Sequence, residues 1–424
     1  MKNTKFKLII MNFLEFAIWG AYLTSQGRYL ASVGLADNIG WFYSVQGIVS
    51  IFMPALMGIL ADKWDAKKVL SLCHFLAGIA MIATGMYGLN AGSNVQFGTL
   101  FTLYTISVAF FMPTIALSYS VAYSVLEKAG MDTVTSFPPI RIWGTIGFII
   151  MMWSVDLAGF QATSAQYAVS GALSIVLALY ALSLPSCKVE KRIENNESKK
   201  NLAEAMGLKA FSLFKEKQMA VFFIFSFLLG AALQISNGFA NPFLGDFEGV
   251  TAYANTFGVQ HSNILVSLSQ ISETLCILMI PFFLKKFGIK RVVLLAMFAW
   301  SLRFLFLGLG NPGEGVWLFI LSMIVYGMAF DFFNISGSLF VDKNTSKEMR
   351  SSAQGLFMLM TNGLGAAIGS ILAQALVTNF TSGLTGTEKM TGWSTAWFVF
   401  AAYAAIVGIL FAIFFNYKHK KEGA

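Results

Sequence analysis

Long hydrophobic runs follow one another along the whole chain, with short polar stretches between them. A helix that crosses a lipid bilayer needs about 20 consecutive apolar residues, and twelve of the runs reach that length. They predict helices at residues 8–31, 39–61, 69–90, 98–125, 134–157, 165–187, 219–243, 260–284, 290–310, 315–340, 352–378 and 392–416. We therefore expect an all-α integral membrane protein with twelve transmembrane helices.

One long charged segment, "KVEKRIENNESKKNLAEAMGLKAFSLFKEK" from Lys188, divides the predicted helices six and six. The expected domains are a first six-helix half at 1–187, a cytoplasmic linker at 188–218, and a second half with a short cytoplasmic tail at 219–424. Apolar residues near helical spacing in the linker predict a short helix on the inner membrane surface. These residues are Leu202, Met206, Ala210 and Leu213.

The composition agrees with a membrane protein, since 56% of the residues are hydrophobic and only 12% are charged. A typical soluble domain carries about 25% charged residues. Of the 29 Lys and Arg residues, 25 lie in the N-terminal arm, in alternate loops and in the tail. Because basic residues mark cytoplasmic loops, both termini and the middle segment are expected in the cytoplasm. The net charge of +8 then reflects topology and does not indicate binding to nucleic acid.

The cysteines and histidines form no recognisable site. They are Cys73, Cys187, Cys276, His74, His261 and His419. The cysteines have no paired spacing and the histidines have no metal signature, so we expect no metal and no cofactor. The chain also lacks a nucleophile with a neighbouring base and a phosphate-binding loop, which argues against an enzyme.

Both halves carry a short basic hairpin after their second predicted helix: "GILADKWDAKK" from Gly58 and "PFFLKKFGIKR" from Pro281. Parallel duplication of a six-helix unit is the layout of major facilitator transporters. The first hairpin resembles the loop motif that helps to latch the cytoplasmic gate in that superfamily, and the second copy has Lys285 in place of Asp62. The matching residues are Gly58, Asp62, Lys63, Lys67 and Lys68. For the lysines, a basic turn that only sets the topology is the alternative.

At least five ionisable side chains lie deep in the predicted membrane helices, although each costs about 2.5 to 3.5 kcal/mol at the centre of a bilayer. They include Glu15, Arg141, Glu273, Arg303 and Asp331. At a rise of about 1.5 Å per residue, Arg141, Glu273 and Asp331 fall within roughly 7 Å of the middles of their helices, as does Gln234. These four residues are expected to form one polar layer.

Polar residues in several predicted helices recur three and four positions apart, which places them on one helix face. The stripes are Asn12, Glu15, Trp19, Tyr22 and Gln26; Arg141, Thr145 and Phe148; Gln234, Asn237 and Asn241; Asn263, Ser267, Gln270, Glu273 and Thr274; and Asp331, Asn334 and Ser338. We expect stripes from both halves to meet at a water-filled central cavity. Hydrogen bonding between helices, worth about 0.6 to 2 kcal/mol per bond, is the alternative for the amides. A second alternative is an ion pair between Asp331 and Arg141 or Arg303. Because buried ion pairs add little stability, such a pair would be more plausible as part of a conformational switch than as a stabilising contact.

The chemistry of this layer suits a nucleoside. Carboxylates and amides bond to hydroxyls, an amide pair matches the edge of a planar heterocycle, and phenyl rings cover its faces. A sugar would fit the polar groups equally well. Burial disfavours the charged form of a carboxylate, which makes Asp331 or Glu273 a candidate proton carrier.

Five long segments carry a resemblance to a known family. They are "DTVTSFPPIRIWGTIGF" from Asp132, "LQISN" from Leu233, "SQISETL" from Ser269, "FDFFNISGS" from Phe330 and "SAQGLFMLMTNG" from Ser352. Almost the whole chain resembles the nucleoside:proton symporter family of the major facilitator superfamily. The resemblance implies uptake of purine and pyrimidine nucleosides, of the uridine, adenosine, inosine and cytidine class, across the bacterial inner membrane. It also implies alternating access driven by a proton gradient, and we expect a monomer in the lipid bilayer.

The resemblance also assigns functional residues. Nine positions that contribute to nucleoside binding or transport in the family are matched here: Arg141, Thr145, Phe148, Gln234, Asn237, Gln270, Glu273, Phe330 and Asp331. Asp331, Glu273 and Arg141 are the candidates for proton coupling. The chain departs from the family at Ala232, where relatives can carry Glu. It also has no Arg in residues 98–125, where many proton-coupled members of the superfamily carry one, and this favours Arg141 as the basic partner.

Two other functions are compatible with these residues. One is a proton-coupled sugar or glycoside transporter, and the other is a nucleoside receptor that does not transport. The intact hairpin motif and the lack of a soluble sensory domain favour transport over the receptor.

Overall fold

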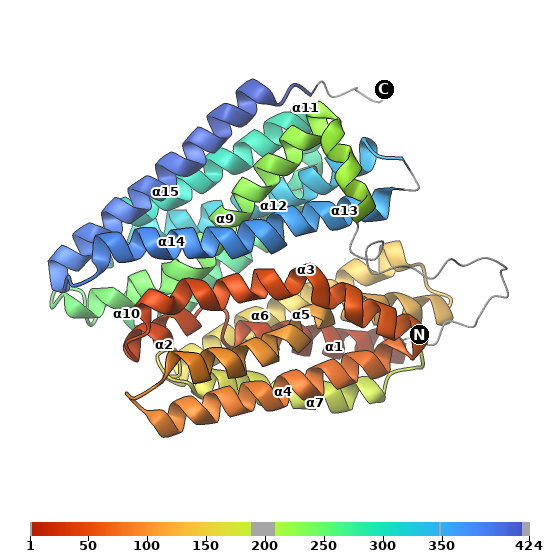
Figure 1. Cartoon of the computed structure of the whole chain (residues 1–424), viewed down its shortest axis with the longest axis horizontal. Coiled ribbons are helices and arrows are strands. Elements are labelled where there is room, and N and C mark those ends of the chain that lie inside the picture. Colours follow the sequence, from red (N-terminus) through yellow and green to blue (C-terminus); the bar gives the residue numbers. More distant parts are fainter. Residues whose placement is uncertain (1, 188–207, 347–348, 418–424) are drawn as a thin grey trace. The chain divides into compact units, whose positions relative to one another are not determined.

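The computed structural model describes residues 2–187, 208–346 and 349–417. Every secondary-structure element in these residues is helical, as the hydrophobic pattern predicts (Figure 1). The chain forms two compact units, Met1–Met206 and Gly207–Ala424, called here the N-terminal unit and the C-terminal unit.

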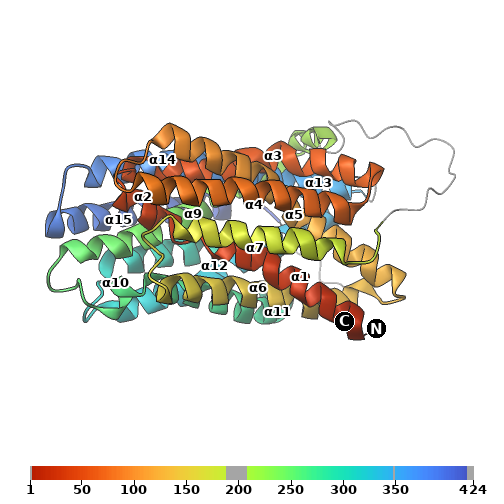
Figure 2. The ribbon, with the colours of Figure 1, turned by 90° about the horizontal axis from the view of Figure 1, so that it is seen from below.

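The N-terminal unit is coloured red to yellow-green in Figure 1. Its described helices are α1 (Lys2–Gly20), α2 (Gln26–Ser32), the 3₁₀ helix η1 (Ala36–Asn38), α3 (Ile39–Lys63), α4 (Ala66–Ala91), α5 (Phe97–Lys128), α6 (Thr133–Leu157) and α7 (Ala165–Leu182). α4 packs against both α5 and α7, and α7 runs alongside α4 (Figure 2). α1 packs mainly against α6. This packing decides which side chains face one another inside the unit.

The first predicted helix, 8–31, is broken in the structure. Residues 21–25 form turns between α1 and α2. Gly20, at the break, faces the backbone of Phe148 on α6, and Gly147 of α6 faces the backbone of Phe13 on α1. A Cβ at either glycine would collide with that backbone, so these glycines let α1 and α6 approach closely.

The C-terminal unit is coloured green to blue in Figure 1. Its described elements are the 3₁₀ helix η2 (Leu208–Lys215), α9 (Lys217–Asp246), the 3₁₀ helix η3 (Phe247–Gly249), α10 (Phe257–Gln260), α11 (Ser262–Leu309), α12 (Val316–Lys343), α13 (Arg350–Met358), the π-helix η4 (Leu359–Gly365), α14 (Ala366–Thr381) and α15 (Gly386–Phe414). α12 and α15 both pack against α11. η2 is the described end of the predicted linker helix, and the rest of that prediction lies outside the described residues.

The number of long helices differs from the twelve predicted runs. In the described residues, ten helices are long and apolar enough to cross a membrane. α1 is not among them, because its 19 residues include Lys5, Lys7 and Glu15. The runs predicted at 260–284 and 290–310 are joined in α11, which contains one non-helical residue, Gly288, with φ 73° and ψ 167°. Glycine adopts this conformation without strain, so it lets the chain change direction inside the predicted basic hairpin.

Candidate functional site

Arg141 on α6 is partly exposed and is held by two other helices of the N-terminal unit. Its Nε donates a hydrogen bond to the hydroxyl of Tyr119 on α5 at 2.6 Å. Its guanidinium lies over the ring of Phe16 on α1, 3.9 Å from the ring centroid, a cation–π contact. Nη1 is 3.5 Å from the hydroxyl of Thr145, so the structure brings together the first two predicted residues of α6.

Phe148, the third predicted residue of α6, is buried. Its ring meets the edge of Trp19 on α1, with the ring centroids 6.4 Å apart and the planes at 84°. Trp19 also packs against Phe111 on α5, at 6.1 Å. These aromatic contacts set the position of Phe148 relative to α1.

In the C-terminal unit, Tyr326 on α12 lies at the centre of the predicted residues. Its ring stacks on Phe330 with an interplanar angle of 9° and a centroid distance of 5.8 Å. Its hydroxyl interacts with the side chain of Gln270, and the tyrosine interacts electrostatically with Glu273, Asp331 and Arg303. We call Tyr326, Phe330, Gln270, Glu273 and Asp331 the Tyr326 cluster. Sequence reasoning missed Tyr326, although it precedes Phe330 by four positions and so shares its helix face.

Exposure separates the predicted residues into two groups. Phe148 and Asp331 are buried, at 7% and 4% exposure. The other seven predicted residues retain partial exposure: Arg141, Thr145, Gln234, Asn237, Gln270, Glu273 and Phe330. Partly exposed polar side chains on membrane helices are available to a ligand, whereas a buried carboxylate is better placed to hold a proton.

Arg303 on α11 is 1% exposed and joins three helices. Its guanidinium donates hydrogen bonds to the hydroxyl of Ser236 on α9 at 3.0 Å, to the hydroxyl of Ser269 at 3.2 Å, and to the carbonyl oxygen of Ser322 on α12 at 2.9 Å. It also lies over the ring of Tyr326, 4.6 Å from the centroid. Arg303 therefore supports the Tyr326 cluster from one side.

Some of the predicted polar stripes hold helices together. Nδ2 of Asn241 on α9 donates to Oδ1 of Asn263 on α11 at 2.6 Å, and the hydroxyl of Ser262 donates to Oδ1 of Asn241 at 2.9 Å. The hydroxyl of Ser338 on α12 donates to the Gln354 side chain at 3.1 Å. At these residues the structure contains hydrogen bonds between helices, which was the alternative to ligand binding.

The polar stripe predicted for the first helix faces the interior of the N-terminal unit. Glu15 contacts His74 on α4 and Thr114 on α5, and Tyr22 packs against Tyr104 on α5. The expectation that this stripe lines a cavity shared with the other half is therefore wrong for Glu15. The sequence marked Glu15 but not His74, because the two residues lie 59 positions apart.

The predicted gate hairpin begins at the end of α3. Asp62 is exposed, and the buried carboxylate of this hairpin is Asp65. Oδ1 of Asp65 accepts from the backbone N–H of Lys67 and of Cys187, and Nζ of Lys67 donates to the carbonyl oxygen of Leu182 at 3.2 Å. These bonds tie the start of α4 to the end of α7. Sequence reasoning missed Asp65, although an Asp directly before a helix is a common N-cap.

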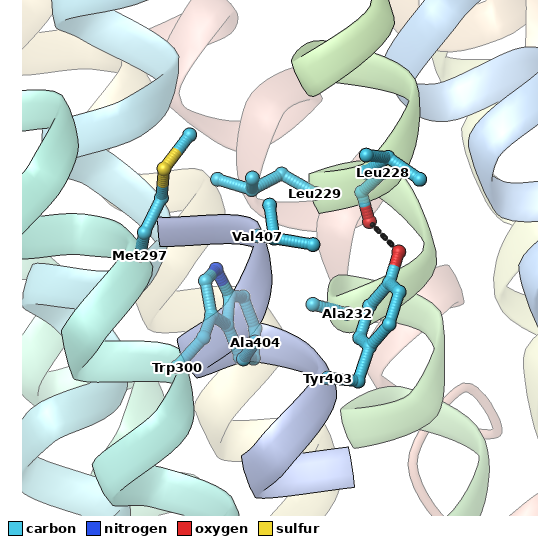
Figure 3. A pocket seen from close by; sticks show the side chains of 8 residues that line it. All are labelled: Leu228, Leu229, Ala232, Met297, Trp300, Tyr403, Ala404 and Val407. Atoms are coloured by element: carbon cyan, nitrogen blue, oxygen red, sulfur yellow. Dashed lines mark hydrogen bonds between the residues drawn. The ribbon is translucent and has the colours of Figure 1, made fainter. Parts of the chain in front are cut away.

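A small pocket lies between α9, α11 and α15 (Figure 3). Its lining consists of Leu228, Leu229, Ala232, Met297, Trp300, Tyr403, Ala404 and Val407. The hydroxyl of Tyr403 points to α9 and donates to the carbonyl oxygen of Leu228 at 2.8 Å. The pocket volume is about 10 Å³, which is about the space that one water molecule needs. Its size and apolar lining do not suit a nucleoside, and it contains none of the predicted site residues.

Comparisons with known proteins agree on one family. A family model described as nucleoside H⁺ symporter matches residues 1–420. Nucleoside permease NupG of Escherichia coli is 46% identical over 421 residues, which cover 98% of this chain and 97% of that protein. Xanthosine permease of the same organism is 45% identical with the same coverage.

Solved structures give the same result. The crystal structure of the nucleoside transporter NupG matches with a TM-score of 0.88 at 46% identity, covering 98% of this chain and 100% of that one. A bacterial homolog of the human lysosomal transporter Spinster matches with a TM-score of 0.68 at 14% identity, covering 97% of this chain and 96% of that one. At that identity the second match shows the fold alone.

Proposed function

Because the chain belongs to the nucleoside H⁺ symporter family, we propose that it carries purine and pyrimidine nucleosides into the cell together with protons, by alternating access. The observation that carries this proposal is the Tyr326 cluster. In it, polar side chains that are available to a ligand lie beside a buried carboxylate and a stacked aromatic ring. The relatives at 45% and 46% identity are named as nucleoside and xanthosine permeases, which supports this substrate class.

In the C-terminal unit, four polar residues are proposed to grip the ribose and the base: Gln234, Asn237, Gln270 and Glu273. Amide groups both donate and accept hydrogen bonds, and a carboxylate accepts from ribose hydroxyls. Phe330 would pack on the ring system of the base. Its parallel stacking on Tyr326 supports this role, because it fixes the plane in which the base would lie.

In the N-terminal unit, Arg141, Thr145 and Phe148 are proposed to contribute to the substrate site. Arg141 keeps partial exposure while two other helices fix its position. A guanidinium held in this way presents a fixed set of donors. Phe148 would provide apolar contact to the base next to it.

Asp331 and Glu273, with Arg141, are proposed to couple proton binding to transport. Coupling requires that proton and nucleoside favour the same conformational change, because a ligand shifts an equilibrium only by its difference in affinity for the two states. Asp331 is buried, and both Asp331 and Glu273 interact electrostatically with Tyr326. These observations support a linked response of the two carboxylates to protonation. No metal or cofactor is part of this proposal.

We also propose the membrane topology. α1 with α2 forms one crossing, and the segments of α11 before and after Gly288 form two, which together with the other long helices makes twelve crossings. The distribution of basic residues then places both termini in the cytoplasm, in the inner membrane of a bacterium. The protein would act as a monomer. The hairpin after α3 would latch the cytoplasmic gate, with Gly58, Asp62, Lys63, Lys67 and Lys68 as its residues.

The test of this function is uptake of labelled uridine into membrane vesicles that contain the protein. Accumulation is expected to be lost when an uncoupler removes the proton gradient. Accumulation that persists with the uncoupler would reject proton coupling. Competition for uridine uptake distinguishes a nucleoside transporter from a sugar transporter. Inosine should displace uridine, and free ribose should not.

Asp331→Asn tests the proton carrier, because it keeps the shape of the side chain and removes the titratable group. We expect this variant to exchange nucleoside across the membrane but not to concentrate it. The measurements are counterflow at equal pH and accumulation under a pH gradient. If the variant still concentrates uridine, Asp331 does not carry the coupled proton.

A further inference from the structure

Glu15 of α1 and His74 of α4 form a pair in the interior of the N-terminal unit. Nε2 of His74 lies 2.8 Å from Oε2 of Glu15, and both side chains are 0% exposed. The hydroxyl of Thr114 on α5 is 2.6 Å from Oε1 of Glu15, and the hydroxyl of Ser174 on α7 is 3.1 Å from Nδ1 of His74. Four helices thus contribute one side chain each to a closed polar network.

The hydrogen bonds of His74 are compatible with a proton on each ring nitrogen. When the hydroxyl of Ser174 donates to the carbonyl oxygen of His74, 2.9 Å away, it accepts from Nδ1. In this arrangement Nδ1 carries a hydrogen, and a second one lies between Nε2 and Oε2 of Glu15. The second proton makes either an imidazolium with a carboxylate or a neutral imidazole with a carboxylic acid.

Thr114 allows the pair to accept one more proton. Its hydroxyl has a single hydrogen and two acceptors, Oε1 of Glu15 and the carbonyl oxygen of Phe111, each at 2.6 Å. When Oε1 is bare, the hydroxyl donates to it. When Oε1 carries a proton, the hydroxyl turns to Phe111 and accepts from Glu15 instead. A proton can therefore be added without leaving a buried group unbonded, which is the costly outcome in an apolar interior.

We propose that the Glu15–His74 pair is a proton-binding site of the N-terminal unit, which takes up one proton on Glu15 in each transport cycle. This site acts in addition to the carboxylates of the C-terminal unit. The proton comes from water, forms an O–H bond at Oε1, and returns to water, so no other reactant is needed. The proposal rests on the proposed proton-coupled transport.

Two polar atoms near Glu15 on α1 are buried without a hydrogen-bond partner among the described residues. They are Oδ1 of Asn12, three positions before Glu15, and Nε1 of Trp19, four positions after it. Buried polar atoms of this kind are normally satisfied by ordered water. Water at these positions would deliver the proton and remove it.

Two aromatic residues of α1 connect the pair to the proposed substrate residues. Phe16 is next to Glu15, and its ring centroid lies 3.9 Å from Cζ of the Arg141 guanidinium. Trp19, one turn further, meets the ring of Phe148. A movement of α1 that follows protonation of Glu15 would therefore change the position of both Arg141 and Phe148.

The charged and titratable groups around the pair come from three helices. Among the described residues they are Cys73 on α4, Tyr119 on α5 and Arg141 on α6. α7 presents to α1 and α4 the neutral hydroxyls of Ser170 and Ser174. Tyr119 interacts electrostatically with Glu15 and bonds to Arg141. The charge on Glu15 is thus linked to Arg141 through Tyr119 as well as through Phe16.

Glu15→Gln is the sharpest variant, because it removes the proton site and keeps the network. The carboxamide oxygen accepts from Thr114, and the amide donates to Nε2 of a neutral His74, so each hydrogen bond survives. His74→Gln is the second variant. Each coupled proton multiplies the limiting accumulation ratio about tenfold under a pH gradient of one unit. Loss of this site should therefore lower that limit about tenfold per pH unit.

The experiment uses the purified full-length protein in liposomes and labelled uridine. Counterflow at equal pH measures exchange, and uphill accumulation under a pH gradient of one unit measures coupling. Both variants should retain counterflow, and their limiting accumulation should be about tenfold lower than that of the wild-type protein. Glu314→Gln and His261→Gln, which lie outside the network, are the matched controls and should accumulate like the wild-type protein.

Two results would overturn the proposal. If Glu15→Gln and His74→Gln accumulate uridine like the wild-type protein, the pair carries no coupled proton. If they lose counterflow and accumulation equally and unfold at a lower temperature, the pair is a fixed structural bridge. Failure of the proposed function is recognised separately, because the wild-type protein itself would then show no uridine counterflow or no response to the pH gradient.

Discussion

Each unit places an arginine in a membrane helix and over an aromatic ring, yet the two arginines differ in their surroundings. Arg141 is partly exposed and lies over Phe16, whereas Arg303 is 1% exposed and lies over Tyr326. Arg303 bonds to groups from three helices, while Arg141 bonds to Tyr119 and to its own helix. The comparison shows that two membrane arginines differ in burial and in partners: Arg303 is enclosed by groups from three helices, whereas Arg141 keeps part of its surface exposed.

The two arginines also use their tyrosines in different ways. Arg141 bonds to the hydroxyl of Tyr119, so this contact depends on one polar atom. Arg303 lies over the ring of Tyr326, and the hydroxyl of that tyrosine is left to interact with Gln270. Arg303 and Gln270 are thus connected through opposite parts of one side chain, the ring and the hydroxyl.

The matched variants Arg303→Ala and Arg141→Ala should give the largest difference. Arg303→Ala removes a buried side chain and leaves three acceptors without their donor, so it should lower the free energy of unfolding by about 2 to 5 kcal/mol. Arg141→Ala should change stability little and abolish uridine counterflow. Thermal unfolding of the purified protein and counterflow in liposomes measure the two effects. Equal losses of stability in both variants would contradict the division of roles.

Tyr119→Phe and Tyr326→Phe should give a smaller difference. Tyr119→Phe removes the acceptor of Arg141. Tyr326→Phe keeps the ring under Arg303 but removes the hydroxyl that interacts with Gln270. One hydrogen bond is worth about 0.5 to 1.5 kcal/mol, so each variant should weaken uridine binding about two- to tenfold. The contact between Arg303 and the ring should be unchanged in Tyr326→Phe, so the variant should unfold at the same temperature as the wild-type protein. A clear fall in that temperature would mean that the hydroxyl, and not the ring, supports the arginine.

Ser236→Ala should give the smallest effect. It removes one of the acceptors of Arg303 and leaves Ser269 and the Ser322 carbonyl in place. The expected loss of unfolding free energy is about 0.5 to 1.5 kcal/mol, with uridine counterflow unchanged. A loss of counterflow without a loss of stability would show that Ser236 takes part in transport, and so that the surroundings of Arg303 are more than support.

The hydrophobic pattern was sufficient to predict an all-α membrane protein and the location of nearly all long helices. It was not sufficient to predict their ends. The first helix breaks after Gly20, a residue that lies against the Phe148 backbone, and the turn at Gly288 depends on one residue with positive φ. Hydropathy averages over about 20 residues, so it does not detect a break at a single residue.

For the site, the sequence marked ionisable residues by their cost inside a membrane, and it marked their neighbours by helical spacing. These rules selected Arg141 with Thr145, and Glu273 with Gln270. They missed Tyr326 and Asp65, although the spacing from Phe330 and the position directly before a helix were local signals for these two residues. They also missed His74, because its partner Glu15 lies on another helix, 59 positions away. A histidine in an apolar helix has no distinctive sequence signal until its partner is known.

The sequence alone determined the membrane environment, the helical class and the family, because composition, periodicity and long matching segments are properties of neighbouring residues. Only the tertiary structure decided which polar groups meet. It paired Glu15 with His74 across 59 positions and placed Tyr326 between Arg303 and Phe330. It also directed the polar stripe of the first helix toward the interior of the N-terminal unit. These choices depend on how helices pack, since a polar group in a membrane must find its partner on another helix, and no local pattern records which one.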